Sequence, residues 1–251
     1  MKAFVINLRD NPERRAFMKA QLDRLGLDYE FFDAIEGARY RDDPRWYDPE
    51  KSIASVNREL RPGEVGCALS HAFVYKEIAR RTLPCAFVLE DDAILSDDVP
   101  GVLERLEKGE LRQGEIVFLE RCDYVLPFSS RRLIGKYRIA TPVLVKLGST
   151  AQAAGYVMSL EAARRIMDAN IPVAFPADNW GFYRGLVAFR GVTPTLTLVR
   201  QRVEFGSTTT RGVRPAFRRH NVVMLLGYGF FMFTGAGRRI RRFLKERGLM
   251  R

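Results

Sequence analysis

The sequence predicts an α/β domain followed by a basic C-terminal extension. Short apolar runs alternate with longer amphipathic segments over the first 210 of the 251 residues, which is the pattern of strands and helices in an α/β sheet. Residues 211–251 contain eleven Lys and Arg against one Glu and so hold +10 of the net charge of +11. The charge of the chain therefore belongs to the extension, and the domain itself is close to neutral.

The N-terminal part predicts one strand–helix–strand unit. Residues 2–6 form an apolar run with Val and Ile, as in a buried strand. Pro12 is typical of a first helical turn, and Gly26 is typical of a helix end. Residues 29–32 predict the second strand. This unit is expected to open the sheet.

The middle of the chain continues the alternation. Residues 39–60 are polar and predict an irregular segment. Residues 64–81 predict a helix, and the uniformly apolar residues 85–89 predict a strand that is covered on both faces. The later expected elements are a helix at about 98–108, strands at 115–119, 138–147, 154–158 and 192–199, and a helix at 160–169 that Ser159 opens.

Composition and targeting signals exclude several classes of protein. No run approaches the roughly 20 apolar residues that a membrane-spanning helix needs. Charge follows the apolar residues 2–6 at once, which is unlike a signal peptide, so we expect a cytoplasmic location. Cys67, Cys85 and Cys122 are scattered and form no CxxC pair, so their spacing indicates neither a disulfide framework nor a zinc site.

The segment VLEDDAILSDDVP, residues 88–100, places Glu90, Asp91 and Asp92 directly after a predicted strand. In open α/β sheets, ligands bind at the carboxyl ends of the strands. Adjacent carboxylates repel one another unless a cation neutralises them, and Mg²⁺ and Mn²⁺ prefer oxygen ligands, including substrate phosphates. The run predicts a metal–diphosphate site, with a solvated surface turn as the alternative. Residues 96–98 are instead expected to begin the next helix.

Several blocks of the sequence resemble glycosyltransferase family 25. VINLRDNPERR, GEVGCALSH and VLEDDAILSDD occur in that order, and GSTAQAAGYVMS, FPADNW and VRQRVEFGST follow them. The resemblance covers about residues 1–210. It implies a GT-A-like domain, a mixed sheet flanked by helices, that transfers a sugar from a UDP-sugar to an acceptor hydroxyl with inversion. Mn²⁺, or Mg²⁺, is the ion that such a site implies.

The resemblance also implies roles for single residues. Glu90 and Asp92 stand where the family holds its metal, and Glu90 and Asp91 stand among its donor-binding acids. Asp178 in FPADNW matches the second acidic position of the family and is the candidate base. Its alternatives are a loop turn or a part in orienting the acceptor. His71 is a candidate catalytic or donor-site residue, with a structural hydrogen bond as the alternative.

Further residues are expected around the donor. Asn7, Arg9 and Asp33 follow or flank the first two strands, where the nucleotide is expected to lie. Ser70 shares the block of His71, and Gln152 lies in the block that is expected to border the donor sugar. Arg14 or Arg15 could meet a phosphate or lie on a solvated helix face. Gly66 and Cys67 are expected to pack closely against a strand, with the thiol acting as an inert small hydrophobe.

The basic extension predicts contact with a membrane surface. Residues 222–233 form an apolar, aromatic run with basic residues on both sides, which suits a helix lying in the interface of an anionic membrane. A core helix with solvated arginines is the alternative. Nucleic-acid binding also uses positive charge, but no recognisable nucleic-acid motif accompanies it.

These observations together predict a peripheral enzyme on the cytoplasmic face of a bacterial inner membrane. It is expected to move galactose from UDP-galactose to a terminal sugar of a lipid-linked oligosaccharide, as in lipooligosaccharide or lipopolysaccharide synthesis. A glucosyltransferase or an N-acetylhexosaminyltransferase is the alternative within the same chemistry. A non-catalytic module that binds a membrane or a nucleic acid is the alternative from another class.

Overall fold

The computed structural model describes residues 1–120, 122, 125–126, 129–143, 152–193 and 199–201. The extension at 211–251, and with it the predicted interfacial helix, lies outside the described residues. No helix within the described ranges is long and apolar enough to cross a bilayer.

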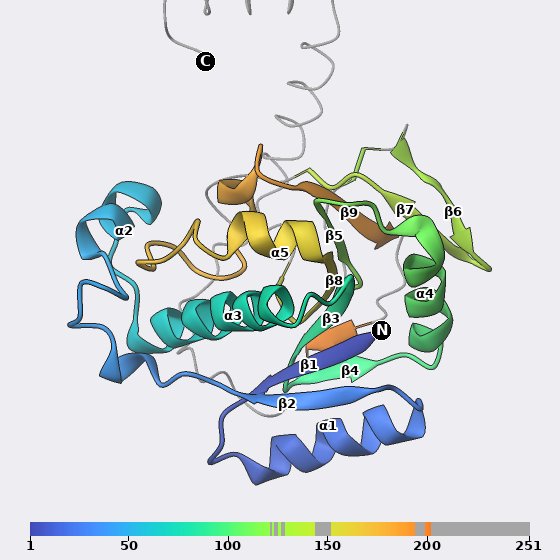
Figure 1. Cartoon of the computed structure of the whole chain (residues 1–251), viewed down its shortest axis with the longest axis horizontal. Coiled ribbons are helices and arrows are strands. Elements are labelled where there is room, and N and C mark those ends of the chain that lie inside the picture. The colour runs from blue at the N-terminus through green and yellow to red at the C-terminus, as the bar shows by residue number, and fades with distance from the viewer. Residues whose placement is uncertain (121, 123–124, 127–128, 144–151, 194–198, 202–251) are drawn as a thin grey trace, which may run out of the picture. The chain divides into compact units, whose positions relative to one another are not determined.

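The described residues form a mixed eight-stranded sheet with helices on both faces (Figure 1). The strand order is β2-β1-β3-β8-β5-β9-β7-β6. The strands are β1 (Lys2–Asn7), β2 (Tyr29–Asp33), β3 (Cys85–Glu90), β5 (Glu115–Phe118), β6 (Arg131–Ile134), β7 (Tyr137–Ala140), β8 (Gly155–Ser159) and β9 (Ala188–Thr193). Strand β1 pairs in parallel with β2 and β3, whereas β8 is antiparallel to both β3 and β5. A separate antiparallel pair joins β4 (Ala93–Leu95) to β10 (Val199–Gln201).

Alternation along the strands sends side chains to two cores. Ala3 and Val5 pack with α1 (Pro12–Arg24) and α4 (Val99–Arg105), whereas Phe4 and Ile6 pack with α3 (Pro62–Arg80) and α5 (Leu160–Ile166). Strand β3 is buried on both faces from Cys85 to Leu89, as its uniformly apolar run predicts. The α/β architecture and its mixed sheet, flanked by helices, are therefore confirmed.

The prediction of an irregular segment at 39–60 is wrong in part. Helix α2 (Pro49–Val56) lies within it, after the short helix η1 (Gly37–Arg39). The Asp48 side chain accepts a hydrogen bond from the Lys51 amide at 2.8 Å, and Pro49 occupies the first turn. Both are ordinary helix-start signals that the polar composition of the segment obscured.

Two later strands begin earlier than expected. The strand expected at 192–199 is β9, which starts at Ala188. Its start was misplaced because the buried Arg190 interrupts the apolar pattern of the strand. The strand expected at 138–147 is β7, which begins one residue earlier and already ends at Ala140, so the prediction is wrong for residues 141–143, and 144–147 lie outside the described residues. Strand β7 forms a hairpin with β6 through a turn at Gly135 (φ 51°). The helix expected at 98–108 is α4, and a π-helical turn (Leu106–Glu110) follows it.

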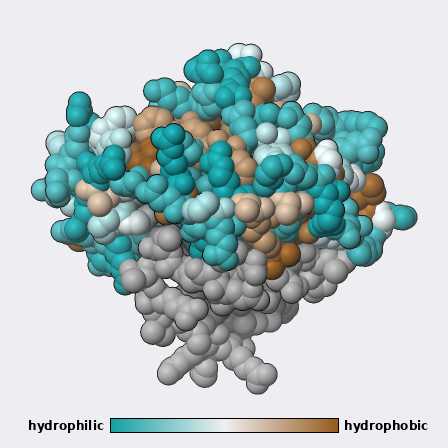
Figure 2. Space-filling view, turned by 90° about the horizontal axis from the view of Figure 1, so that it is seen from below, coloured by the Kyte–Doolittle hydropathy of each residue, from teal (hydrophilic) through white to brown (hydrophobic). Residues whose placement is uncertain are grey.

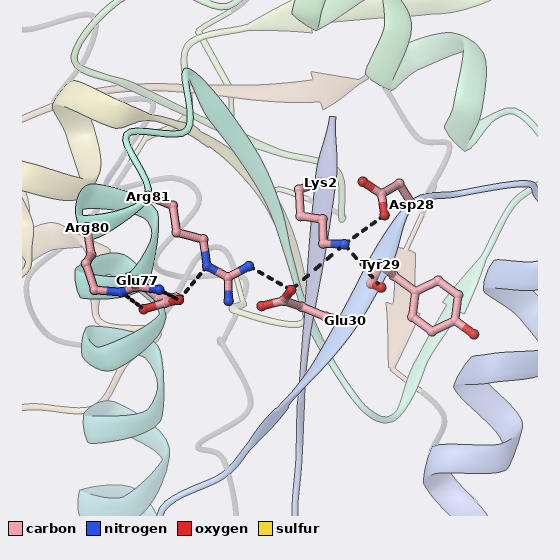
Figure 3. A network of polar contacts seen from close by, with 7 residues as sticks. All are labelled: Lys2, Asp28, Tyr29, Glu30, Glu77, Arg80 and Arg81. Carbon is pink, nitrogen blue, oxygen red and sulfur yellow. Dashed lines mark hydrogen bonds and ion pairs between the residues drawn. The ribbon is translucent and has the colours of Figure 1, made fainter.

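A network of exposed ion pairs joins α3 to the start of the sheet (Figure 3). Arg81, which follows α3, lies 2.8 Å from Glu30 on β2, and Lys2 on β1 lies 2.7 Å from Asp28 and 3.8 Å from Glu30. Such exposed pairs contribute little stability each. The network lies at the end of β1 opposite to Asn7, and hence away from the acidic run.

The described surface is mainly hydrophilic on the face shown in Figure 2, with smaller apolar areas between the polar side chains. Such a surface is expected because the fold buries most of its large apolar side chains in the two cores on either side of the sheet.

Candidate functional site

The acidic run lies at the carboxyl end of β3, where the chain leaves the sheet. Glu90 is half-buried, and Asp91 and Asp92 are 7% and 8% exposed. Strand β4 follows at once, and the backbone of β10 pairs with it so that Gln201 lies opposite Ala93. The alternative of a solvated surface turn is therefore wrong for Asp91 and Asp92, because buried carboxylates need partners or a cation.

The later acids of the segment behave differently. Asp98 occupies the N-cap position of α4, as expected, but makes no side-chain capping hydrogen bond. Its carboxylate accepts from the Tyr137 hydroxyl at 2.5 Å and lies 3.1 Å from the Lys136 ammonium. Asp97 pairs with Arg24 on α1. These two acids are exposed and bind neighbouring side chains.

Asp91 is fully engaged by the protein. Arg14 Nη1 on α1 donates to Asp91 Oδ1 at 2.7 Å, and Asn7 Nδ2 donates to Asp91 Oδ2 at 2.8 Å. All three side chains are buried. Asn7 and Asp91, both predicted to contact the donor, thus contact each other and hold α1 to the ends of β1 and β3. Arg14 is not on the solvated helix face.

Glu90 points to helix α3. Its Oε1 atom lies 3.4 Å from His71 Nε2 and 3.9 Å from Cys67 Sγ. Cys67 and His71 are four residues apart and share one face of the helix. The three ligand atoms lie within 4.8 Å of one another and could hold a metal ion.

The ring of His71 is fixed from its other side. His71 Nδ1 lies 2.7 Å from the Tyr156 hydroxyl on β8, which lies 2.6 Å from the Tyr75 hydroxyl on α3. His71 is 1% exposed, and its Nε2 atom has no hydrogen-bond partner among the described residues. Its buried Nε2 therefore faces Glu90 with its bonding capacity unused.

Asp92 also has a buried polar atom with unused bonding capacity. Its Oδ1 atom is buried without a hydrogen-bond partner among the described residues, and Arg14 Nη1 lies 3.9 Å from Oδ2. Burial and then the charge of Glu90 raise the pKa of Asp92 to about 7, against the opposing charge of Arg14. A cation beside Asp92 would stabilise its ionised form against both burial and the charge of Glu90.

Glu120, which no sequence argument singled out, belongs to the same site. It follows β5, is 3% exposed, and its Oε1 atom has no hydrogen-bond partner within the described ranges. Burial, and then the charges of Glu90 and Asp178, raise its pKa well above that of an ordinary glutamate. Its signal in the sequence is only one acid after an apolar strand, which is weak.

Asp178 lies in the same electrostatic environment. The Cys67 thiol shows this, because its pKa is raised first by burial and then by the charges of Glu90, Asp178 and Asp92. Asp178 is half-buried in a turn in which the Asn179 amide donates to the Pro176 carbonyl at 3.1 Å. The next residue, Trp180, is 1% exposed and packs its ring 5.0 Å from that of Tyr156. This packing anchors the turn beside the acidic site.

The remaining predicted residues lie in varied surroundings. Ser70 is fully buried, accepts from the Ile35 amide at 2.8 Å and donates to the Gly66 carbonyl at 2.7 Å. Arg9 is exposed in the turn after β1, and Asp33 is exposed 3.6 Å from Arg15. Gln152 is half-buried, and its carbonyl accepts from the Trp180 indole at 3.2 Å.

The expectation for Gly66 and Cys67 needs correction. A Cβ atom on Gly66 would lie 2.3 Å from the Ile35 carbonyl oxygen and 2.7 Å from the Gly37 amide, so Gly66 packs closely, but against the loop after β2. Cys67 is half-buried beside the polar side chains of Glu90 and His71, whereas the raised pKa of its thiol, caused first by burial, agrees with the expected low reactivity.

The side chains of this site are suited to binding a divalent cation. The site gathers four carboxyl groups, Glu90, Asp92, Glu120 and Asp178, and three buried polar atoms without hydrogen-bond partners among the described residues, on His71, Asp92 and Glu120. Buried charges need a counter-charge or they neutralise by protonation. A bound cation would supply that counter-charge.

Comparisons with known proteins agree with one another. The family model described as glycosyltransferase family 25 (LPS biosynthesis protein) matches residues 1–180. A glycosyltransferase 25 family member of Aedes aegypti is 27% identical over 70% of this chain and 32% of its own length. Procollagen galactosyltransferase 1-B of Xenopus laevis is 31% identical over 67% of this chain and 28% of its own. Inactive glycosyltransferase 25 family member 3 of Mus musculus is 28% identical over 75% of this chain and 35% of its own. The chain thus spans about a third of the length of these relatives.

Proposed function

This chain belongs to glycosyltransferase family 25, and we propose that it transfers a hexose, galactose first among the candidates, from a UDP-sugar to a terminal sugar of a lipid-linked oligosaccharide. The observation that carries the proposal is the pair of acids Glu90 and Asp92, half-buried and buried, at the carboxyl end of β3, with Asp92 Oδ1 free of hydrogen bonds among the described residues. Diphosphate ligands are held at this end of α/β sheets.

We assign the metal site to two acids of the run. Glu90 and Asp92 would hold a divalent ion, Mn²⁺ or Mg²⁺, whose chemistry when bound is to neutralise the charge that develops on the leaving UDP. Asp91 serves indirectly, because Arg14 and Asn7 occupy both of its oxygens. Its role is to fix the backbone from which Glu90 and Asp92 project.

Asp178 is the residue that we assign to the acceptor. An inverting displacement needs a base on the acceptor hydroxyl, within hydrogen-bond reach. Asp178 is half-buried, and its charge acts on Cys67 and Glu120 in the same site. Trp180 holds its turn against Tyr156. We therefore assign to Asp178 the role of accepting the proton of the acceptor hydroxyl, with His71, whose Nδ1 lies 2.7 Å from the Tyr156 hydroxyl, beside Glu90.

The names of the relatives support the choice of donor and acceptor. The Xenopus relative is named a galactosyltransferase, and the family description refers to LPS biosynthesis. Glucose and N-acetylhexosamine remain the alternative donor sugars. The mouse relative is named inactive, so a non-catalytic binding module is the second candidate function.

Release of UDP separates these candidates. The full chain is incubated with UDP-galactose, UDP-glucose or UDP-N-acetylglucosamine, in Mn²⁺ or in EDTA. We expect UDP release that needs Mn²⁺ and is fastest with UDP-galactose. Metal-independent turnover would contradict the metal assignment, and absence of turnover with all three donors would favour the non-catalytic module.

Three substitutions test the residues, and the first two are a matched pair. Asp92→Ala is expected to abolish UDP release, whereas Asp98→Ala, in the exposed part of the same run, leaves it intact. Asp178→Asn is expected to lower kcat about 100-fold or more while donor binding is retained. Equal effects at Asp92 and Asp98 would remove the basis for dividing the run.

A further inference from the structure

We propose that Cys67, His71 and Glu90 form a binding site for a borderline-soft divalent ion of the zinc class, distinct from the oxygen-liganded ion assigned above to Glu90 and Asp92. The site goes beyond the proposed function, because it requires no sugar transfer. Glu90 is the one residue that the two sites share.

The distances suit a tetrahedral ion. Ligand atoms about 2.1 Å (N, O) and 2.3 Å (S) from a tetrahedral Zn²⁺ lie roughly 3.4 to 3.6 Å from one another. His71 Nε2 and Glu90 Oε1 lie 3.4 Å apart, and Cys67 Sγ and Glu90 Oε1 lie 3.9 Å apart. All three atoms lie within 4.8 Å of one another, so small side-chain rotations close the remaining difference.

The elements that carry the ligands are firmly placed. Cys67 and His71 lie on one face of α3, a helix of 19 residues, and Glu90 is the last residue of the buried strand β3. His71 is 1% exposed, and its Nε2 atom, which faces Glu90, has no hydrogen-bond partner among the described residues. A buried imidazole nitrogen in this state is costly unless a ligand uses it.

Tyr156 supplies the outer hydrogen bond that a metal-binding histidine needs. Metal-bound imidazoles donate their other N–H to an acceptor, which fixes the tautomer and the ring. The Tyr156 hydroxyl lies 2.7 Å from His71 Nδ1 and 2.6 Å from the Tyr75 hydroxyl. Tyr156 can therefore accept from Nδ1–H and donate to Tyr75, which leaves the Nε2 lone pair for the ion.

The set of donors selects the ion. Thiolate and imidazole favour Zn²⁺ and its neighbours over Mg²⁺ and Mn²⁺, which prefer oxygen. Three protein ligands leave a fourth position for water. The nearby Asp92 and Asp178 add negative charge that favours a cation. Because Glu90 serves both sites, a zinc-class ion is expected to inhibit any Mn²⁺-dependent turnover.

Cobalt provides a direct readout, because a thiolate bound to Co²⁺ gives an intense near-ultraviolet charge-transfer absorption. Co²⁺ is titrated into the full-length wild type and into Cys67→Ala, with Cys85→Ala, which removes a buried cysteine of β3 outside the proposed site, as the matched control. We expect the band in the wild type and in Cys85→Ala but not in Cys67→Ala. Zn²⁺ added in equal amount should remove it.

Tyr156→Phe tests the outer hydrogen bond. It keeps the ring and is expected to weaken Co²⁺ binding about 10- to 100-fold while the band keeps its shape. Circular dichroism checks the folding of each variant. A further measurement needs only the wild type: alkylation of Cys67 is followed by mass spectrometry with and without added metal. We expect Zn²⁺ to protect Cys67 from alkylation and Mn²⁺ to give little protection.

The outcomes separate this site from the proposed function. Absence of the band in the wild type, its persistence in Cys67→Ala, or alkylation of Cys67 at the same rate with and without Zn²⁺ would each overturn the site. None of these readouts uses turnover. An inactive protein that still shows the band would refute the transferase alone.

Discussion

Arg14 Nη1 donates to Asp91 Oδ1 at 2.7 Å, and both side chains are buried where helix α1 meets the end of β3. This pair explains the division of labour in the acidic run. Arg14 and Asn7 neutralise and bind the middle acid, so the outer acids, Glu90 and Asp92, are the ones left for a ligand. Asp91 thus fixes the backbone of the run, and the side chains of Glu90 and Asp92 are available to a ligand.

Loss of Arg14 is expected to destabilise the fold strongly. Arg14→Ala leaves Asp91 buried without its counter-charge, which costs about 3–5 kcal/mol for a buried pair. Arg15→Ala is the matched control, because Arg15 is half-exposed, stacks over Phe31 at 4.2 Å and is worth about 1 kcal/mol or less. Urea unfolding in EDTA measures both. Similar costs for the two variants would show that Arg14 is not a buried partner.

The pKa of Asp92 predicts how stability depends on pH in the absence of divalent ions. A folded-state pKa of about 7 lies above the ordinary 3.8, so the native state holds this proton to higher pH than the unfolded chain does. Its contribution to the free energy of unfolding therefore falls as pH rises from about 4 to 7. Asp92→Asn removes the effect, and we expect the variant to gain stability over the wild type at pH 8, on the order of 1 to 4 kcal/mol, but little at pH 4. A difference between the two proteins that is equal at both pH values would contradict the shift.

Gly66 predicts a steric requirement close to the site. In Gly66→Ala the new Cβ would meet backbone atoms of Ile35 and Gly37 at 2.3 and 2.7 Å, so α3 must shift. We expect a loss of about 1–3 kcal/mol or more, together with weaker binding of Co²⁺ by the neighbouring Cys67 and His71. Gly101→Ala on α4 is the control, because its nearest neighbour is a flexible Ile134 methyl at 3.9 Å, and it should be neutral or slightly stabilising.

The basic extension predicts salt-dependent binding to anionic vesicles. With a net +10 in residues 211–251, the full chain is expected to sediment with vesicles that contain phosphatidylglycerol and not with purely zwitterionic ones. Binding should weaken as salt rises towards 1 M, where the Debye length falls to about 3 Å. Binding to duplex DNA with no preference for anionic vesicles would favour the nucleic-acid alternative.

Much of the fold was predictable because its signals are local. The runs at 2–6 and 85–89 are apolar throughout, and they form buried strands. The position of β8 between β3 and β5 was not predictable, since strand order depends on contacts between distant segments. Helix α2 was missed although Asp48 and Pro49 signal its start.

The site was predictable in part for the same reason. Glu90, Asp92 and His71 lie in recognisable blocks, whereas Glu120 is one acid after a strand and gained meaning only from its neighbours. The spacing of Cys67 and His71 is that of one helix face and was visible in the sequence. The third partner, Glu90, depends on the packing of α3 beside β3, which no local pattern of the sequence specifies.

Glu115 and Arg190 show why an apolar pattern alone misplaces β9. Arg190 Nη2 pairs with Glu115 Oε2 between β9 and β5, and both side chains are buried. Arg190→Met alone leaves a buried carboxylate and is expected to cost about 3–5 kcal/mol. Glu115→Leu combined with Arg190→Met removes both charges and should recover much of that loss, because two apolar side chains leave no charge unpaired. A double-mutant cycle by urea unfolding measures the coupling. Additive losses would mean that the two residues act independently of each other.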